Sequence, residues 1–333
     1  MDTITTIGPK SWGEDVVKAH IKMGVKCIRF PFAKEPPHEQ VTRCEMVREI
    51  ADGLGKPILT MADLPGGKPR LSNTQPVSIS ADRLYRIALS PTKKAKTDFY
   101  IDPGLPHDTV VGGDVITIGD GENLFRVESS NDIVVLGYFE HSGELERKRA
   151  FLPNGKALSI DSFTPTDREM ARIASSGKFD WLALSFVDSP QDVRDVRQWL
   201  RKELRWNPKI VAKIESLRGT LRVAEIAQVA DCIMIARGDL ALQLGFSGLW
   251  HAQESILNAC KSMNVYSIAA TGFLDTGSQT LVPSRSECID ICAALRMGAN
   301  AIMLSAETTI GPYPIEVVEL LTRIGEACEA PIA

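Results

Sequence analysis

The chain has 333 residues, of which 44% are hydrophobic and 24% charged, and its formal net charge is -4. This composition is typical of a globular protein with a large core, and its acidic balance argues against a surface for nucleic acid or anionic lipid. No apolar run approaches the roughly 20 residues of a membrane span, and "MDTITTIGPK" lacks a signal-peptide pattern, so we expect a cytoplasmic protein without membrane partners.

Short runs of apolar and β-branched residues recur along the chain, with amphipathic stretches between them. Runs such as "ILTM" and "IMI" are apolar on both faces, which is typical of strands in a parallel sheet covered by helices. The sequence predicts strands at residues 4–9, 26–30, 57–63, 181–186, 209–214, 232–237, 266–270 and 301–306. Eight strands alternating with helices favour an α/β fold of the (β/α)8 TIM-barrel type over an open doubly wound sheet.

Three of the helices between these strands have N-capping signals. Thr164 and Ser189 are each followed by proline, which suits an N-cap and the first helical position. "SRSE" at residues 284–287 is a capping box. We therefore expect helices to begin at these three places.

The alternation of strands and helices is interrupted after the third predicted strand. The segments "LYRIAL", "VITIG", "LFRVES" and "DIVVLGYFE" alternate in polarity and are separated by turn signals. They predict a small all-β lid domain at residues 72–151, inserted after strand 3. The barrel domain would then comprise residues 1–71 and 152–333.

Seven cysteines are spread along the chain without a C-x-x-C pair. An odd number without metal-ligand spacing is typical of reduced, buried thiols in a cytosolic enzyme. We therefore expect free thiols, including Cys288 and Cys292 on one predicted helix.

Polar side chains collect at the C-terminal ends of the predicted strands, where a barrel of this type has its active site. They are Arg29, Asp63, Ser185, Lys213, Glu215, Arg237, Asp239, Thr271, Ser305 and Glu307. Lys213 and Glu215 are two residues apart on an extended segment, so their side chains should point to the same side. Glu215 and Asp239 follow neighbouring strands, and two oxygen-donor groups often hold a hydrated Mg²⁺ or Mn²⁺. A buried ion network that closes the barrel mouth would show the same pattern.

Gly238 and Gly272 provide permissive turns among these polar residues. Gly238 precedes the apolar helical stretch "LALQL", so backbone N–H groups at the helix start could bind a carboxylate or phosphate. Thr271 adds a hydroxyl beside Gly272. We expect Arg237 to be a structural partner that buttresses Glu215 rather than a catalytic group.

These motifs resemble those of the pyruvate kinase family over essentially the whole chain. The matching segments are "TTIGPKS", "KCIRFPFAKE", "MADLPGGKPR", "LPNG", "DWLALSFVDSPQDV", "IVAKIES", "ADCIMIARGDLAL", "AATGFLD", "PSRSE" and "AIMLSAETTIGPYPIE". The resemblance implies a (β/α)8 catalytic domain with a β-rich lid. It also implies a glycolytic kinase that transfers phosphoryl from phosphoenolpyruvate to ADP, giving pyruvate and ATP.

Carried over to this chain, the resemblance implies that Glu215 and Asp239 hold the catalytic Mg²⁺ or Mn²⁺ and that Lys213 faces the transferring phosphoryl group. The N–H groups around Gly238 and Asp239, with the Thr271 hydroxyl, would bind the carboxylate of phosphoenolpyruvate.

Further site residues follow from the same resemblance. A relay that protonates the enolate carbon would comprise Thr271, Ser305 and Glu307. The substrate-binding residues would also include Arg29, Arg70, Lys68 and Ser185, of which the two arginines face the phosphates.

The chain departs from the family on the nucleotide side. Pro31 and Ala33 replace the family's asparagine and serine, which bind K⁺. Lys34 replaces its nucleotide-facing histidine. The ammonium of Lys68 would stand in for K⁺, so K⁺ should not be required. In the lid, Asp120 is retained while Gly119 replaces a second aspartate, which leaves Lys34 and Asp120 as candidates on this side.

The sequence leaves the reaction and the assembly open. The chain stops after the eighth predicted barrel helix, at "EACEAPIA", so we expect no C-terminal regulatory domain. We also expect a homodimer through barrel helices. One alternative to a minimal pyruvate kinase is an enzyme using a metal-bound enolate or oxo acid as a decarboxylase, aldolase or lyase, or for transfer to an acceptor other than ADP. Another is a non-catalytic metabolite-binding protein, but retention of Lys213 with both carboxylates favours an enzyme.

Overall fold

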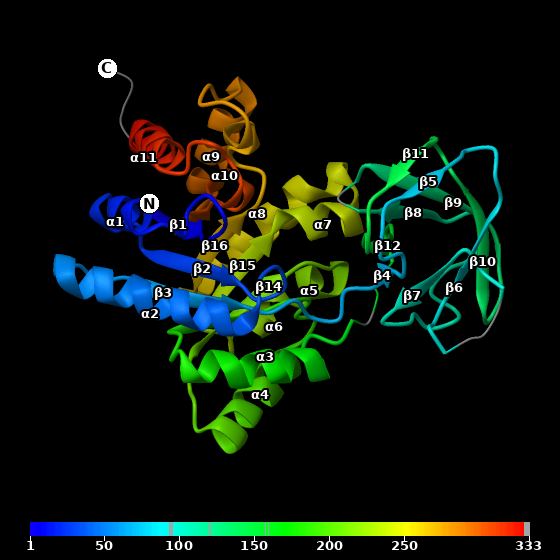
Figure 1. Ribbon diagram of the computed structural model, residues 1–333, viewed down its shortest axis with the longest axis horizontal. Coiled ribbons are helices and arrows are strands. Elements are labelled where there is room, and N and C mark those ends of the chain that lie inside the picture. The colour runs from blue at the N-terminus through cyan, green and yellow to red at the C-terminus, as the bar shows by residue number, and fades with distance from the viewer. Residues whose placement is uncertain (93–95, 120, 157, 159, 330–333) are drawn as a thin grey trace.

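The computed structural model describes residues 1–92, 96–119, 121–156, 158 and 160–329. Eight parallel strands close into a barrel in the order β1-β17-β16-β15-β14-β13-β3-β2 (Figure 1). Their bounds are β1 Asp2–Thr6, β2 Cys27–Pro31, β3 Leu59–Asp63, β13 Trp181–Leu184, β14 Lys209–Ile214, β15 Cys232–Ala236, β16 Tyr266–Ala270 and β17 Ala301–Met303. The predicted eight-stranded barrel is therefore confirmed.

Four predicted strands, the first, fourth, sixth and eighth, extend past the observed strand ends, which are Thr6, Leu184, Ala236 and Met303. The first strand ends at Thr6 rather than at residue 9, because the Gly8 carbonyl accepts hydrogen bonds from the N–H groups of Ser11 and Trp12 in a turn. The sixth ends at Ala236, because Arg237 is already the first residue of a helix.

Helices surround the barrel and bury its outer face. Their bounds are α1 Glu14–Lys22, α2 Pro37–Leu54, α3 Pro165–Ser176, α4 Pro190–Trp199, α5 Leu217–Leu221, α6 Val223–Ala227, α7 Arg237–Leu244, α8 Phe246–Met263, α9 Arg285–Met297, α10 Ala306–Thr309 and α11 Glu316–Glu329, with a π-helix η1 Leu200–Leu204 and a 3-10 helix η2 Asp275–Ser278. The predicted N-caps Thr164, Ser189 and Ser284 are confirmed, and each forms a capping box. Among the described helices, none combines the length and the apolarity needed to cross a lipid bilayer.

A second sheet of seven strands lies between β3 and β13 in the chain, to the right of the barrel in Figure 1. Its order is β12-β8-β9-β10-β6-β7-β4, and β5 and β11 form a separate pair. The bounds are β4 Arg70–Leu71, β5 Val77–Ile79, β6 Tyr85–Ala88, β7 Phe99–Asp102, β8 Val115–Ile118, β9 Asn123–Ser130, β10 Val134–Phe139, β11 Gly143–Leu145 and β12 Phe151–Pro153. The four predicted strand segments of this region are confirmed as β6, β8, β9 and β10, while the domain boundaries at residues 72 and 151 stay a prediction.

The second sheet has a hydrophobic core that includes side chains of the barrel. Phe125 and Phe139 pack edge to face in it, with ring centroids 5.2 Å apart. Phe186, which follows β13, and Leu242 on α7 belong to the same buried cluster. The Gly155 N–H, just after β12, also donates to the Gln243 carbonyl at 2.7 Å. Helix α7 is therefore anchored to both the barrel and the second sheet.

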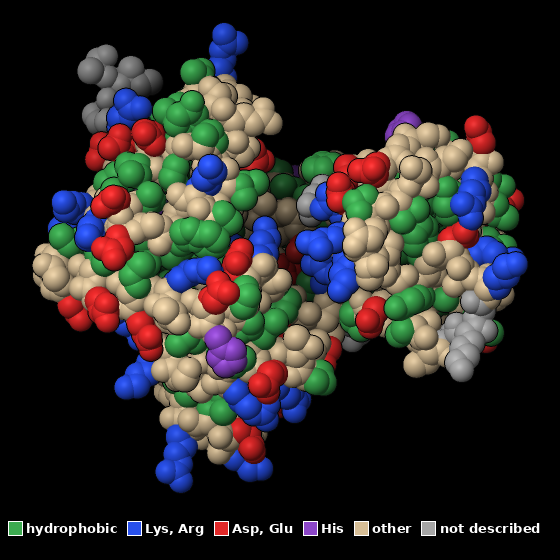
Figure 2. Space-filling model, viewed as in Figure 1, with side chains coloured by type: hydrophobic (Ala, Val, Ile, Leu, Met, Phe, Trp, Pro, Cys, Tyr) green, Lys and Arg blue, Asp and Glu red, His purple; other side chains and the backbone are tan. Residues whose placement is uncertain are grey.

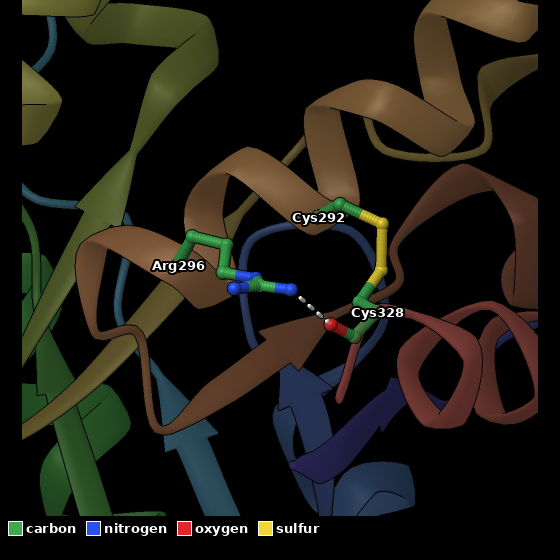
Figure 3. The surroundings of a disulfide bond; sticks show 3 residues. All are labelled: Cys292, Arg296 and Cys328. Carbon is green, nitrogen blue, oxygen red and sulfur yellow. Dashed lines mark hydrogen bonds between the residues drawn. A yellow bond between two sulfur atoms is a disulfide. The ribbon is translucent and has the colours of Figure 1, made fainter. Parts of the chain in front are cut away.

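The prediction that all cysteines are free thiols is wrong. Cys292 on α9 and Cys328 on α11 form a disulfide (Figure 3), and the Arg296 guanidinium donates to the Cys328 carbonyl at 3.0 Å. The remaining cysteines are free, and four of those five are buried. Sequence spacing could not reveal this pair, because the two cysteines are 36 positions apart and only the packing of α11 on α9 brings them together.

Replacing Cys328 by serine is expected to lower the free energy of unfolding of the oxidised protein by roughly 2–4 kcal/mol, because the crosslink restricts the unfolded chain. Urea unfolding without reductant measures the change. Cys288→Ser is the matched control, since Cys288 is a free thiol one turn before Cys292 on the same helix. An equal effect of both substitutions, or seven reactive thiols in the unreduced unfolded protein, would contradict the crosslink.

Candidate active site

The mouth of the barrel faces the second sheet across a cleft, and Lys and Arg side chains gather on both of its sides (Figure 2). The cleft contains two cavities. The first cavity, of about 580 Å³, lies at the ends of the strands β14 to β17, and its wall includes Glu215, Gly238, Thr271 and Ser305. The second cavity, of about 340 Å³, is lined by Pro31, Ala33, Leu64, Arg70, Gly119, Arg149 and Ser185, among others. Five residues line both cavities: Arg29, Lys34, Lys68, Lys213 and Asp239.

Lys213 is the centre of a buried polar cluster between the cavities. Its Nζ lies 3.1 Å from Asp63 Oδ1 and 3.2 Å from Glu215 Oε1, and it donates to Ser185 Oγ at 2.7 Å. Burial disfavours the ammonium, but the carboxylates of Asp63 and Glu215 outweigh it and raise the pKa of Lys213 above its ordinary value. The structure therefore holds a charged lysine where the two cavities meet.

Asp63 is a part of the site to which the sequence analysis gave no role. Its Oδ2 accepts a hydrogen bond from Arg29 Nε at 2.7 Å, while its Oδ1 faces Lys213. Burial alone would favour the neutral acid, yet Lys213 and Arg29 hold the pKa of this carboxyl below its usual range. Its place at the C-terminal end of β3 was the available signal, since such positions face the mouth of a barrel.

Glu215 lies directly after β14 with its side chain on the same side as Lys213, as predicted. Its Oε2 accepts the Phe186 N–H at 2.8 Å. Burial and the nearby Asp239 carboxylate raise the pKa of Glu215 above its ordinary value, although Lys213 opposes this. Strands β14 and β15 pair in parallel, which brings the two carboxylates to one end of the barrel.

Asp239 forms an ion pair with Lys68. The Lys68 Nζ donates to Asp239 Oδ1, and both side chains are largely shielded from solvent. This contact is not one that sequence spacing indicated. The expectation that the Lys68 ammonium replaces K⁺ stays a prediction.

Gly272 forms the expected turn with a positive φ of 78°, whereas Gly238 lies within helix α7, so the prediction of a turn there is wrong. A Cβ on Gly238 would lie 3.2 Å from the Thr271 Cγ2, so a larger residue would crowd this side chain. Thr271 has φ 76°, in the left-handed region that β-branched residues rarely adopt. Such strained backbone concentrates at functional sites, and here it holds Thr271 on the wall of the first cavity.

Ser305 and Glu307 lie together after β17. The Ser305 N–H donates to Glu307 Oε2 at 2.6 Å. Ser305 lines the first cavity, whereas Glu307 is buried beside it, with 1% of its surface exposed. This burial raises the pKa of the Glu307 carboxyl. The structure thus brings the three predicted relay residues to one end of the barrel, with Glu307 buried next to Ser305.

The prediction that Arg237 buttresses Glu215 is wrong. Its guanidinium donates to both oxygens of Asp290 on α9, at 3.0 and 2.5 Å, and lies 3.8 Å from the centre of the Phe273 ring. Arg237 is the first residue of α7, and this places its side chain toward α9. It therefore connects the two helices, while Lys213 and the Phe186 N–H hold Glu215.

The second cavity is lined by several cationic side chains. Arg70 on β4 donates to the Lys148 carbonyl at 3.0 Å, and Arg149 Nε lies 2.8 Å from Glu122 Oε1. Sequence reasoning missed Arg149, whose place shortly before "LPNG" was the only signal. Lys34 lines both cavities, whereas the predicted Asp120 lies outside the described residues.

The donor atoms of the first cavity fit a divalent cation. In the part of the chain that the structure describes, no three His, Cys, Asp or Glu side chains gather as a ligand cage. Glu215, directly after β14, and Asp239, on the helix α7 that follows the neighbouring strand β15, nevertheless both line this cavity. Two carboxylates suit Mg²⁺ or Mn²⁺, which usually keep several water or substrate oxygens in their coordination shell.

Comparison with known proteins identifies relatives of the whole described region. The chain matches the family described as "Pyruvate kinase, barrel domain" over residues 1–318. It is 28% identical to a pyruvate kinase of Thermotoga maritima over 332 residues, which cover 98% of this chain and 70% of that protein. It is 32% identical to a pyruvate kinase of Thermococcus litoralis, with coverages of 98% and 69%. For a pyruvate kinase of Staphylococcus saprophyticus the identity is 29%, and the chain spans 56% of that protein's length.

Proposed function

Because the chain belongs to the pyruvate kinase family, we propose that it transfers the phosphoryl group of phosphoenolpyruvate to ADP, giving pyruvate and ATP. The observation that carries this proposal is the buried, charged Lys213, which lines both cavities between the carboxylates of Asp63 and Glu215. Phosphoryl transfer depends on positioning and charge neutralisation more than on covalent catalysis. A fixed cation shared by two substrate cavities suits that requirement.

Phosphoenolpyruvate would occupy the first cavity. The N–H groups of Gly238 and Asp239 and the Thr271 hydroxyl would bind its carboxylate, and Arg29 and Lys213 would face its phosphoryl group. When the bond between phosphorus and the enol oxygen breaks, the Lys213 ammonium lies where it can stabilise the negative charge left on that oxygen. An oxygen of the ADP β-phosphate forms the new bond to phosphorus.

The enolate must then accept a proton at its terminal carbon. Thr271 and Ser305 line the first cavity, and the buried Glu307 carboxyl group accepts a hydrogen bond from the Ser305 backbone N–H. The raised pKa of Glu307 helps it to retain a proton, so these residues can supply the relay.

Glu215 and Asp239 would hold Mg²⁺ or Mn²⁺, which when bound supplies further positive charge for the phosphoryl and enolate oxygens. Lys213 keeps Glu215 in place beside the cavity through its own contacts to Asp63 and Ser185.

The second cavity supports a phosphate-bearing acceptor. The acidic residues in its lining are two, Asp63 and Asp239. The cationic residues in its lining are six, Arg29, Lys34, Lys68, Arg70, Arg149 and Lys213. Such an excess of positive charge favours a polyanion such as ADP over an uncharged acceptor. Residues 72–151 would act as the lid over this cavity. With Pro31, Ala33 and Lys68 in place of the family's pattern, K⁺ would not be required.

The purified protein, incubated with phosphoenolpyruvate and Mg²⁺, is expected to form pyruvate only when ADP is present, with kcat on the order of 1–10³ s⁻¹. Exchanging Na⁺ for K⁺ should leave the rate unchanged. Lactate dehydrogenase and NADH report the pyruvate. Failure to form pyruvate, together with consumption of oxaloacetate or another oxo acid, would replace this proposal with lyase chemistry. Binding of phosphoenolpyruvate without any turnover would leave a metabolite-binding protein.

A further inference from the structure

The two proposed metal ligands in the first cavity, Glu215 and Asp239, are each paired with a lysine of their own. Glu215 contacts Lys213, and Asp239 contacts Lys68. The two pairs differ in how firmly the lysine is held. Lys213 has three side-chain partners, namely Asp63, Ser185 and Glu215. In the described part of the chain, Asp239 is the one hydrogen-bonding or ion-pairing partner of the Lys68 ammonium.

The Lys68 ammonium and a divalent cation would compete for the same carboxylate. The Lys68 side chain is 10% exposed and that of Asp239 is 22% exposed, so water screens this contact only weakly. Two cations at one carboxylate repel each other, and the repulsion grows as the surroundings become less polar. An ion that coordinates Asp239 must therefore displace the ammonium or bind more weakly beside it.

We propose that Lys68 is a positioning residue that occupies Asp239 in the metal-free protein and yields this carboxylate to the divalent cation. The inference rests on the proposed function in that it takes Asp239 as a metal ligand. In the absence of metal, Lys68 neutralises Asp239 and limits its repulsion with Glu215. When metal enters, Lys213 stays in its cluster, and Lys68 is the cation that leaves.

The displaced ammonium has a defined destination. Lys68 lines the second cavity as well as the first, so release from Asp239 adds a free positive charge to the cavity proposed for the acceptor phosphates. Metal binding in one cavity would thereby strengthen anion binding in the other.

Mn²⁺ titration of the substrate-free protein, followed by the electron paramagnetic resonance signal of free Mn²⁺, tests the competition. Lys68→Met is expected to lower the Kd for Mn²⁺ about tenfold or more, because the ion no longer displaces a paired ammonium. The matched control is Lys34→Met, which removes the same charge from the wall of the same two cavities. Lys68 is the lysine that forms the ion pair with Asp239, whereas Lys34 lies in the wall of the cavities. The control should therefore change the Kd for Mn²⁺ by no more than about twofold. A purely structural role for Lys68 predicts weaker Mn²⁺ binding, the opposite sign.

Equal effects of Lys68→Met and Lys34→Met on the Kd would show that Mn²⁺ affinity depends only on the total positive charge around the cavities and not on the contact between Lys68 and Asp239. This result would overturn the inference. Asp239→Asn separates this failure from that of the proposed metal site. If the wild-type protein binds no Mn²⁺, or if Asp239→Asn binds it equally well, Asp239 is not a ligand and both proposals fail. If Mn²⁺ binding depends on Asp239 but not on Lys68, only the role of Lys68 is wrong. Lys68→Gln, which keeps a hydrogen-bond donor without the charge, provides a second variant should the methionine variant unfold.

Discussion

Lys213→Met is expected to lower kcat for pyruvate formation by roughly 10³-fold or more, because the fixed charge that stabilises the enolate oxygen is lost. Methionine matches the length of the side chain but cannot donate to Ser185 or balance Asp63 and Glu215. The Kd for Mn²⁺ should change far less than kcat, because both proposed metal ligands are retained and only a contact that supports Glu215 is lost. Steady-state kinetics and Mn²⁺ titration of the same preparation measure both quantities.

The same substitution also has a cost in stability. Asp63 keeps its ion pair with Arg29 and Glu215 keeps the Phe186 N–H, but a buried negative charge loses its counterion. We expect the free energy of unfolding to fall by about 3–5 kcal/mol while the fold is retained. Lys209→Met is the matched control, because Lys209 is exposed at the opposite end of the same strand, β14. A kcat within tenfold of wild type in a folded Lys213→Met protein would remove Lys213 from the mechanism.

Glu215→Gln is expected to raise the Kd for Mn²⁺ by about 100-fold or more. Loss of a group that merely supports a metal ligand typically costs 10–100-fold in affinity, and Glu215 is proposed as a ligand itself. The amide oxygen of glutamine can still accept the Phe186 N–H, so the change removes the charge with little loss of packing. Much of the lost activity should return at high Mn²⁺ concentration, in contrast to Lys213→Met.

Glu225→Gln makes the identical chemical change on α6, at a side chain that is exposed and paired with Arg222. It should leave both Mn²⁺ affinity and activity unchanged. If Glu215→Gln binds Mn²⁺ as the wild type does, the buried ion network considered from the sequence would explain Glu215 better than a metal site.

The barrel was predictable because its strands are buried on both faces. Val211 and Ile235 are both fully buried. Val211 belongs to the cluster inside the barrel, and Ile235 belongs to the cluster between the barrel and the helices. Strands buried on both faces are apolar throughout. The helix starts at Thr164, Ser189 and Ser284 were predictable for a different reason, since capping depends on residues only three positions apart.

Contacts between residues far apart in the sequence were not predictable in this way. The side-chain period placed Lys213 and Glu215 together, but nothing in the spacing of Lys68 and Asp239 indicated that they pair across 171 positions. Arg237 was expected to buttress Glu215. Its side chain instead lies toward Asp290, because the helix that begins at Arg237 redirects it.

The position of Leu242 in the core of the second sheet has a consequence for synthesis of the chain. The last strand of that sheet, β12, ends at Pro153, whereas Phe186 and Leu242 lie 33 and 89 residues further on. A ribosome has therefore to add much of the barrel sequence before the second sheet can complete its apolar core. Until α7 emerges, the nascent sheet exposes the surface that Leu242 later covers, and final folding of the insertion depends on a helix that is made long after it.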